Sequence, residues 1–317
     1  MTTLLDNHVT TTWSVIHPFS KEDQAAMTAM RAIVEPHKGK LQGTAARVPF
    51  DAVMERVKEP AGVMYEADHV GGVAGWWCQP EGARPHQAVM HIHGGWFNWG
   101  SAQAFRHLAG QIAAHARVAV FVPDYRLAPE HPFPAAVEDI QACYVGLTER
   151  GFSRIAITGD SAGGTLALGL LAHIAANSDG ASKALVGGVA LSPVTDLSLS
   201  GESWSTRAVA DPYFTQLQAT DLVRGYLDGH DSADPLASPL YADLKGLAPI
   251  RVHVGNDEVL LDDSVRFVER AVAEGADARL DIWEGMVHGF LGSVGLLTAS
   301  DEVLQLTSEF LIDRFAE

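Results

Sequence analysis

The feature that most limits the fold of this chain is a repeated alternation of short apolar runs with longer helical patterns. Six runs rich in β-branched residues are predicted strands: 89–93, 118–124, 154–159, 187–193, 250–255 and 279–283. Several are almost wholly apolar, as expected for strands that are covered on both faces. The alternation predicts right-handed β–α–β crossovers and a mostly parallel central sheet flanked by helices, which is an α/β fold.

Helical patterns lie between these runs, and an antiparallel hairpin is expected before them, over 64–80. The predicted helices are 101–115, 135–150, 162–176, 262–274 and 299–315. In sheets of this kind, ligands bind beyond the carboxyl ends of the strands, so we expect the site in the loops that follow the strands. The chain shows no internal repeat and no long linker, which predicts a single domain over 1–317.

Two regions lie outside the alternation, at about 1–50 and about 196–247. The first has Ser20 and Asp23 in positions typical of a capping box, followed by apolar residues at helical spacing. The second is rich in Ser, Asp, Gly and aromatic residues and is inserted between two predicted strands. Insertions at this edge of a sheet shape binding pockets, so we expect both regions to form an α-helical cap.

The charge and the cysteines exclude several classes of protein. With 39 acidic against 22 basic side chains, the net charge of −17 repels nucleic-acid phosphates and anionic lipid, so neither is an expected partner. Cys78 and Cys143 form no metal-binding or disulfide pattern, which fits a reducing compartment. The longest apolar run, 166–176, is too short to span a bilayer, and the start of the chain lacks the pattern of a signal peptide. We expect a cytoplasmic protein.

The segment GDSAGG at 159–164 follows one predicted strand and precedes a predicted helix. Small residues on both sides of Ser161 allow a tight turn that lifts its hydroxyl above the sheet, as a nucleophile requires. A serine also needs a base, and His288 lies just beyond the last predicted strand.

Between Ser161 and His288, the segment GNDEVLLDDS at 255–264 supplies the acid that would orient the histidine. The order Ser, acid, His is that of an α/β hydrolase. Asp257 and Glu258 are both candidates, because either carboxylate could accept the imidazole N–H. We expect Asp262 and Asp263 to cap the helix that follows and to meet the positive end of its dipole.

The attacked carbonyl needs hydrogen-bond donors for its developing negative charge. The Gly-rich segment HIHGGWFNWG at 91–100 follows a predicted strand. The N–H groups of Gly94, Gly95 and Trp96 are therefore expected to converge with that of Ala162 as an oxyanion hole. His91 and His93 share a strand face, but no third ligand stands at a suitable spacing, so no metal site is expected.

From about residue 60 to the end, the chain resembles the hormone-sensitive-lipase-like carboxylesterases of the α/β-hydrolase superfamily. The motifs that carry the resemblance are HGGW at 93–96, DYRLAPEHPFPAA at 124–136, GDSAGG at 159–164, and the acid and histidine segments. The resemblance implies an α/β-hydrolase fold and a network that supports the oxyanion loop. The residues assigned to this network are His93, Asp124, Arg126 and Asp160. The family's acid-x-Leu-x-Asp pattern aligns on 258–262, which favours Glu258 as the acid and leaves Asp257 as the alternative.

One position departs from the family, which usually has a glycine where this chain has Trp96. A bulky side chain there alters the wall of the pocket. The substitution does not decide whether the substrate is an ester, a lactone or an activated amide. Candidate pocket walls are the aromatic residues Trp76, Trp77, Trp96, Phe97, Trp99, Trp204, Tyr213 and Phe214.

The parts together predict a serine hydrolase that cleaves carboxylic esters of short acyl chain through an acyl-enzyme. The expected partner is a small-molecule ester, and no cofactor is required. The alternatives are a lactone hydrolase, an aryl-formamide hydrolase, or a non-catalytic small-molecule receptor on the same fold. Because relatives pair through the last strand and helix, a homodimer is a further hypothesis.

Overall fold

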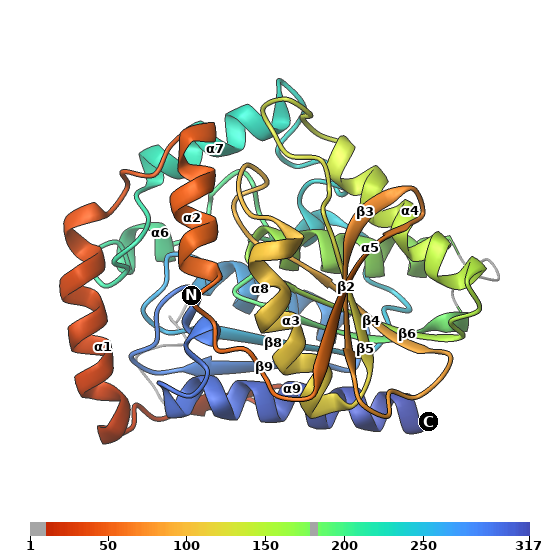
Figure 1. Cartoon of the computed structure of the whole chain (residues 1–317). Helices are drawn as coiled ribbons and strands as arrows, with labels where there is room; N and C mark the ends of the chain where they lie inside the picture. Colours follow the sequence, from red (N-terminus) through yellow and green to blue (C-terminus); the bar gives the residue numbers. More distant parts are fainter. Residues whose placement is uncertain (1–10, 178–182) are drawn as a thin grey trace.

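A nine-stranded sheet forms the centre of the computed structural model, which describes residues 11–177 and 183–317 (Figure 1). The strands are β1 Ser14–His17, β2 Val63–Val70, β3 Val73–Pro80, β4 Gln87–Ile92, β5 Ala119–Pro123, β6 Arg154–Asp160, β7 Leu185–Leu191, β8 Ile250–Gly255 and β9 Ala278–Trp283. Their order is β1-β9-β8-β7-β6-β4-β5-β3-β2. Neighbouring strands are parallel except in the pairs β2–β3 and β3–β5, so the predicted mostly parallel sheet with a leading hairpin is confirmed.

Helices cover both faces of the sheet, as the alternation predicts. The α-helices are α1 Lys21–Val34, α2 Arg47–Met54, α3 Ala102–Ala116, α4 Ala135–Glu149, α5 Ala162–Ala176, α6 Ser203–Thr206, α7 Gln216–Leu227, α8 Leu261–Ala273 and α9 Thr298–Ala316. α3 packs with α9, whereas α4, α5 and α8 contact the strands from the opposite side. Within the described ranges, no helix combines the length and apolar character that crossing a bilayer requires.

The register of the sheet brings the ends of its central strands into line. Ile92 of β4 pairs with Gly159 of β6, and Gly255 of β8 pairs with Trp283 of β9. Because these strands are parallel, the loops that follow them leave from one edge of the sheet. The segments that contain the candidate site residues are therefore neighbours in space.

The edge strand β1 was not predicted from the sequence. It pairs in parallel with β9, and His17 of β1 stacks on Trp283 with 3.8 Å between the ring centroids. Nε2 of His17 also lies 2.8 Å from Oδ1 of Asp281. Four residues with no periodic pattern become a strand because β9 offers an unpaired edge. β1 therefore covers the strand edge through which the sequence hypothesis placed a dimer contact.

The N-terminal helix begins at the residue that the sequence predicts. Ser20 is the N-cap of α1, and its Oγ accepts the N–H of Asp23 at 3.1 Å. The carboxylate of Asp23, which is buried, instead accepts the N–H groups of Thr298 and Ala299 at 2.7 and 3.1 Å. Asp23 thus caps α9 and joins the N-terminal helix to the last helix of the chain.

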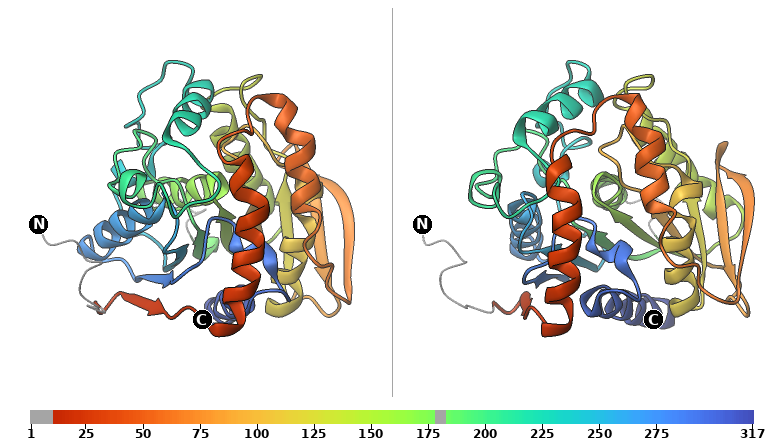
Figure 2. Two further views of the ribbon diagram at one scale, coloured as in Figure 1. Left: turned by 90° about the vertical axis from the view of Figure 1, so that its left-hand side faces the viewer. Right: turned by 60° about the vertical axis from the view of Figure 1, so that its left-hand side comes forward.

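The two regions outside the alternation lie against each other, although they are far apart in sequence. In both views of Figure 2, α1 (red) runs beside the green and teal segment that contains α6 and α7. Gln218 of α7 donates to the carbonyl of Leu41 at 2.7 Å, and the hydroxyl of Tyr213 lies 3.4 Å from the sulfur of Met30. Residues 1–10 of the expected cap are outside the described residues.

Candidate active site

Ser161 lies on the tight turn between β6 and α5. Its backbone has φ +53° and ψ −123°, a strained conformation for a residue with a side chain. A Cβ on Gly163 would collide with the carbonyl oxygen of Ile92, which explains the small residue two positions after the serine. The turn therefore depends on the glycines of the GDSAGG segment.

Three side chains from three strand ends meet at this turn. His288 lies in the loop after β9, and its Nε2 is 3.0 Å from Oγ of Ser161. Its other ring nitrogen, Nδ1, is 2.9 Å from Oε2 of Glu258, which follows β8. A proton on Nδ1 leaves Nε2 as the acceptor for the serine hydroxyl.

The carboxylate of Glu258 is fully buried and is held by more than the histidine. Its Oε1 accepts the hydroxyl of Ser192 and the N–H of Gly255, both at 2.7 Å. Each oxygen of Glu258 therefore has a partner that fixes its direction, as a buried carboxylate requires. Ser192 was missed in the sequence analysis, although its place just after β7 was a usable signal.

Asp257, the alternative acid, faces away from the histidine. Its Oδ2 lies 2.6 Å from the guanidinium of Arg31 on α1. Arg31 also donates to the carbonyl of Ala210 at 2.5 Å. Asp257 therefore links the loop after β8 to the two segments of the expected cap.

The charges around His288 favour its protonated form. Burial lowers the pKa of this imidazole, but the hydrogen bond and charge of Glu258, with Asp211 and Asp160, outweigh burial, so that the pKa is raised above its usual value. The pKa of Asp160 is also raised, which for an acid favours the neutral form. Burial raises its pKa to about 7, against the effects of His288 and of the N–H of Gly94.

The loop after β4 presents unpaired backbone donors beside Ser161. Gly95, Trp96 and Phe97 all have positive φ, at +120°, +54° and +60°. Among the residues that the structure describes, the N–H groups of Gly95, Trp96 and Ala162 donate to no protein acceptor. Free backbone N–H groups of this kind are the donors that an oxyanion site uses.

Gly94 differs from its neighbours in the same loop. Its N–H donates to Oδ1 of Asp160 at 3.0 Å, so this group is committed within the protein. The prediction of Gly94 as a free oxyanion donor is corrected accordingly. Gly94 and Asp160 hold the loop against the serine turn, and a Cβ on Gly94 would collide with Oδ2 of Asp160.

The DYRLAPEHPFPAA segment supports this loop through residues other than those expected. The hydroxyl of Tyr125 donates to the carbonyl of His93 at 2.9 Å, and the two rings stack with centroids 4.3 Å apart. The N–H of Ala128 donates to the carbonyl of Phe97 at 2.9 Å. Tyr125 was not singled out in the sequence, where a tyrosine gives no sign of a partner so distant along the chain.

The two predicted supporting residues of this segment have different surroundings. Oδ1 of Asp124 accepts the N–H of Ala102 at 2.6 Å, at the start of α3 and just beyond the loop. Arg126 instead binds α4, where it donates to Asp139 and Glu138 at 2.9 Å each. The prediction that Arg126 holds the oxyanion loop is corrected, because its guanidinium is occupied by two carboxylates of another element.

Trp96 takes part in an aromatic wall beside the histidine. Its buried indole lies edge-on to Phe214, with ring centroids 5.3 Å apart, and near Trp204 at 6.4 Å. Phe214 in turn lies edge-on to His288 at 5.0 Å. Of the other aromatic candidates, Trp77 packs on Phe121 in the core, away from this wall.

A cavity of about 30 Å³ adjoins the serine on the side of α3 and α9. Ser161, Asp160 and His288 line it together with Met54 and Phe290. A cavity of this volume has room for a few water-sized groups. The free space next to the reactive atoms is therefore small.

His91 and His93 show no arrangement of metal ligands. Nδ1 of His91 is 2.9 Å from the hydroxyl of Thr158, and Nδ1 of His93 is 2.9 Å from the carbonyl oxygen of Gly94. In the described part of the chain, no three His, Cys, Asp or Glu side chains are grouped so that they could hold a metal ion.

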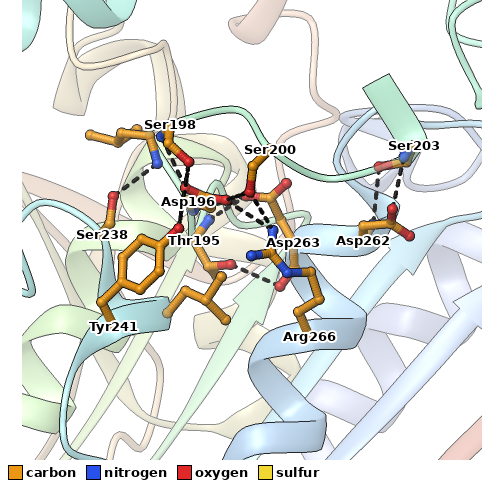
Figure 3. A network of polar contacts seen from close by, with 12 residues as sticks. Thr195, Asp196, Ser198, Ser200, Ser203, Ser238, Tyr241, Asp262, Asp263 and Arg266 are labelled. Carbon is orange, nitrogen blue, oxygen red and sulfur yellow. Dashed lines mark hydrogen bonds and ion pairs between the residues drawn. The ribbon is translucent and has the colours of Figure 1, made fainter. Parts of the chain in front are cut away.

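Asp262 and Asp263 do not cap the helix in which they lie. The N-cap of α8 is Leu260, without a side-chain hydrogen bond. Asp262 accepts the N–H of Ser203 at 2.8 Å, and Asp263 accepts those of Thr195 and Asp196 at 2.8 and 2.9 Å (Figure 3). The predicted side-chain cap is wrong, because both carboxylates satisfy donors of residues 195–203 instead. Both residues do lie in the first turn of α8, at the positive end of its dipole, as expected.

A sheet of this order, with a serine turn after β6 and a histidine after β9, defines an α/β hydrolase. The family model described as the α/β hydrolase fold matches residues 89–292. An acetyl-hydrolase of Streptomyces hygroscopicus is 34% identical over 240 residues, which are 74% of this chain and 79% of that protein.

Solved structures agree with this classification. The chain is similar to an esterase of the bacterial hormone-sensitive lipase family, with a TM-score of 0.86 and 35% identity over 93% of this chain and 99% of the other. It is also similar to EstE5 soaked with p-nitrophenyl butyrate, with a TM-score of 0.84 and 33% identity over 94% and 100% of the two chains. The chain belongs to the hormone-sensitive-lipase-like carboxylesterases of the α/β-hydrolase superfamily, and the resemblance in its motifs is confirmed.

Proposed function

We propose that this protein is a carboxylesterase that hydrolyses small esters of short acyl chain through an acyl-enzyme on Ser161. The observation that carries the proposal is the continuous chain of contacts from Oγ of Ser161 through His288 to Glu258, at 3.0 and 2.9 Å. A serine, a histidine and a buried carboxylate in this order are the parts that covalent acyl transfer requires.

The reaction begins when Nε2 of His288 takes the proton of Ser161 as Oγ attacks the ester carbonyl. The tetrahedral oxyanion is stabilised by the N–H groups of Gly95, Trp96 and Ala162, each worth about 3 kcal/mol. His288 then donates its proton to the leaving alcohol, and the carbon–oxygen bond of the ester breaks. Water, deprotonated by the same histidine, releases the acid and restores the serine. These steps need only protein groups and water.

Glu258 acts by holding His288 and stabilising its imidazolium form. We assign it this role in preference to Asp257, because its Oε2 is the atom that meets Nδ1 and because Asp257 is paired with Arg31. The protein groups around Glu258 keep its carboxylate fixed during the reaction.

The small volume beside Ser161 supports the proposal that the substrate has a short acyl chain. The cavity beside Ser161 is about 30 Å³, and the wall of Trp96, Trp204 and Phe214 occupies the space next to His288. The relative from Streptomyces hygroscopicus is named an acetyl-hydrolase, which is in keeping with a small acyl group. We further propose that residues about 11–50 and 196–247 act as a cap that limits access to this space.

A panel of substrates tests the proposal. Wild type and Ser161→Ala are compared on p-nitrophenyl acetate, butyrate and octanoate, on a medium-ring lactone and on an N-formyl aniline. We expect the acetate and butyrate esters to be hydrolysed fastest and Ser161→Ala to be at least about 10⁴-fold slower. Faster turnover of the lactone or the formamide would move the assignment to those substrates, and no turnover by the wild type would favour a receptor.

The cytoplasmic location and the homodimer stay predictions from the sequence. Cys78 and Cys143 are both buried free thiols, which is in keeping with a reducing compartment. Because β1 covers the outer edge of β9, a dimer would have to use another surface or displace β1. Cell fractionation and light scattering with size-exclusion chromatography test the two predictions.

A further inference from the structure

We propose that Asp211 is a positioning residue for ester hydrolysis, which ties the loop of Glu258 to the aromatic wall beside His288. The inference rests on the proposed function, because it concerns how the same site is held. Asp211 lies in the turn between α6 and α7, far from Glu258 in sequence, and its side chain is fully buried. It is a carboxylate that the mechanism itself does not use.

Each oxygen of Asp211 binds a different part of the site. Oδ2 accepts the N–H of Val259 at 3.0 Å, and Val259 is the residue directly after Glu258. Oδ1 accepts the N–H groups of Tyr213 and Phe214 at 2.8 and 3.0 Å. One buried carboxylate therefore satisfies three backbone donors from two segments of the chain, an arrangement that is costly to break.

The two ends of this connection both reach His288. On one side, Val259 fixes the backbone at Glu258, whose Oε2 meets Nδ1 of the imidazole. On the other side, the ring of Phe214 lies 5.0 Å from the imidazole ring. Displacement of Asp211 would move the acid and the wall together, so Asp211 couples the shape of the pocket to the orientation of the base.

Other bonds of this segment reach the same loop. Nε of Arg207 donates to the carbonyl of Asn256 at 2.8 Å, and the N–H of Asp211 donates to the carbonyl of Arg207 at 2.9 Å. The ammonium of Lys38 donates to the carbonyl of Asp211. The turn is therefore fastened to the acid loop at two points, of which Asp211 is the one next to Glu258.

The charge of Asp211 also acts on the histidine. The ionisable groups that influence His288 are Glu258, Asp211 and Asp160, and all three raise the pKa of the imidazole against the effect of burial. Burial raises the pKa of Asp257 and of Tyr213, and the charge of Asp211 adds to this effect on both groups. If Asp211 only positioned the site, its substitution would change kcat but not the pH profile. Because its charge also acts on His288, substitution should shift the pH profile as well.

The experiment compares Asp211→Asn with Asp211→Glu and with a matched control, Asp23→Asn. Asp23 is likewise a buried carboxylate that accepts two backbone N–H groups, but it lies between α1 and α9, away from the site. Kinetics on p-nitrophenyl acetate are normalised by active-site titration with a fluorophosphonate, and thermal unfolding is followed for each variant.

For Asp211→Asn, we expect kcat to fall about tenfold, since an amide N–H₂ would face the N–H of Val259 or those of Tyr213 and Phe214. The acid limb of kcat/KM should move to lower pH by about half a unit, because a negative charge that favours the imidazolium is lost. Asp211→Glu keeps the charge, so its acid limb should stay in place while the longer side chain lowers kcat severalfold.

Asp23→Asn should lose thermal stability with an unchanged kcat and pH profile. Wild-type kcat and an unmoved acid limb in Asp211→Asn would overturn the proposal, as would wild-type kcat in Asp211→Glu if only that variant folds. Failure of the proposed function would be recognised separately, by a wild type without ester turnover or by an active Ser161→Ala.

Discussion

Oε2 of Glu258 lies 2.9 Å from Nδ1 of His288, whereas the neighbouring carboxylate of Asp257 lies 2.6 Å from the guanidinium of Arg31. Two acids that are adjacent in sequence thus point to different parts of the molecule. In the proposed mechanism the first orients His288, and the second fastens the loop after β8 to the N-terminal helix.

This difference predicts unequal effects of two isosteric substitutions. Glu258→Gln should lower kcat by about 10³- to 10⁴-fold, because an amide cannot stabilise the imidazolium and can orient the ring in the wrong tautomer. Asp257→Asn should keep kcat within a few-fold of wild type. Steady-state kinetics on p-nitrophenyl acetate measure both, and a crippled Asp257→Asn beside a normal Glu258→Gln would show that the assignment is wrong.

The raised pKa of His288 predicts the position of the acid limb. Catalysis needs the neutral imidazole, so activity is lost as pH falls through the pKa of His288, which lies above that of an ordinary histidine. The limb of kcat/KM should therefore lie above about pH 6.5. A profile measured from pH 5 to 9 checks this, and a limb well below that pH would mean that burial outweighs the nearby carboxylates.

Ser192 should affect catalysis through Glu258. Its hydroxyl donates to Oε1 at 2.7 Å, so Ser192→Ala removes one of the bonds that direct the carboxylate. We expect kcat to fall about tenfold, in line with a hydrogen bond to a charged group. Ser198→Ala is the matched control, since Ser198 donates to Asp196 instead, and equal kinetics of the two variants would contradict the role.

The aromatic wall predicts a change in acyl preference. In Trp96→Gly, the left-handed backbone at φ +54° suits glycine, and the lost indole opens space beside Phe214. The ratio of kcat/KM for p-nitrophenyl hexanoate over acetate should rise about tenfold or more. Trp99→Phe serves as control, because the Trp99 indole donates to the carbonyl of Gly43 and lies outside the wall. An unchanged ratio in Trp96→Gly would place the acyl group elsewhere.

Asp263 predicts a pH dependence of stability. Burial, reinforced by the neighbouring Asp196, raises its pKa to about 8 against the effects of backbone N–H groups and Arg266. The folded protein thus holds a proton that the unfolded chain releases near pH 4, and the stabilisation is lost as pH rises from there toward pH 8. Asp263→Asn, which needs no proton, should show a shallower fall of Tm between pH 6 and 9. An equally steep fall in both proteins would contradict this.

Much of the fold could be predicted because its signals are local. A strand can be predicted from the apolar run of β4 or β6 alone, and a tight turn from the glycines around Ser161. Because the strands are parallel, their ends then place Ser161 and His288 at one edge of the sheet. β1 could not be predicted in this way, because its four residues become a strand only by pairing with β9. The same holds for the carboxylates of Asp262 and Asp263, whose partners lie about 60 or more positions away.

The site was predictable to the same extent. The motifs supplied candidates for the nucleophile and the base and two candidate acids, but which acid contacts His288 is set in the folded chain, where Asp257 pairs with Arg31. Similarly, Gly94 and its neighbours look equivalent in sequence, yet only Gly94 meets Asp160. The orientation of a side chain or N–H group depends on hydrogen-bond partners from distant segments, and a local sequence pattern does not identify those partners.

The central claim is that Ser161 forms the acyl-enzyme with His288 as its base. It is tested most directly by reacting the protein with a fluorophosphonate and locating the adduct by mass spectrometry of proteolytic peptides, in wild type, Ser161→Ala and His288→Ala. We predict one adduct, on Ser161, in the wild type, none in Ser161→Ala, and labelling slowed by at least about 10³-fold in His288→Ala. An adduct on another residue, or ester turnover by Ser161→Ala at the wild-type rate, would contradict the account.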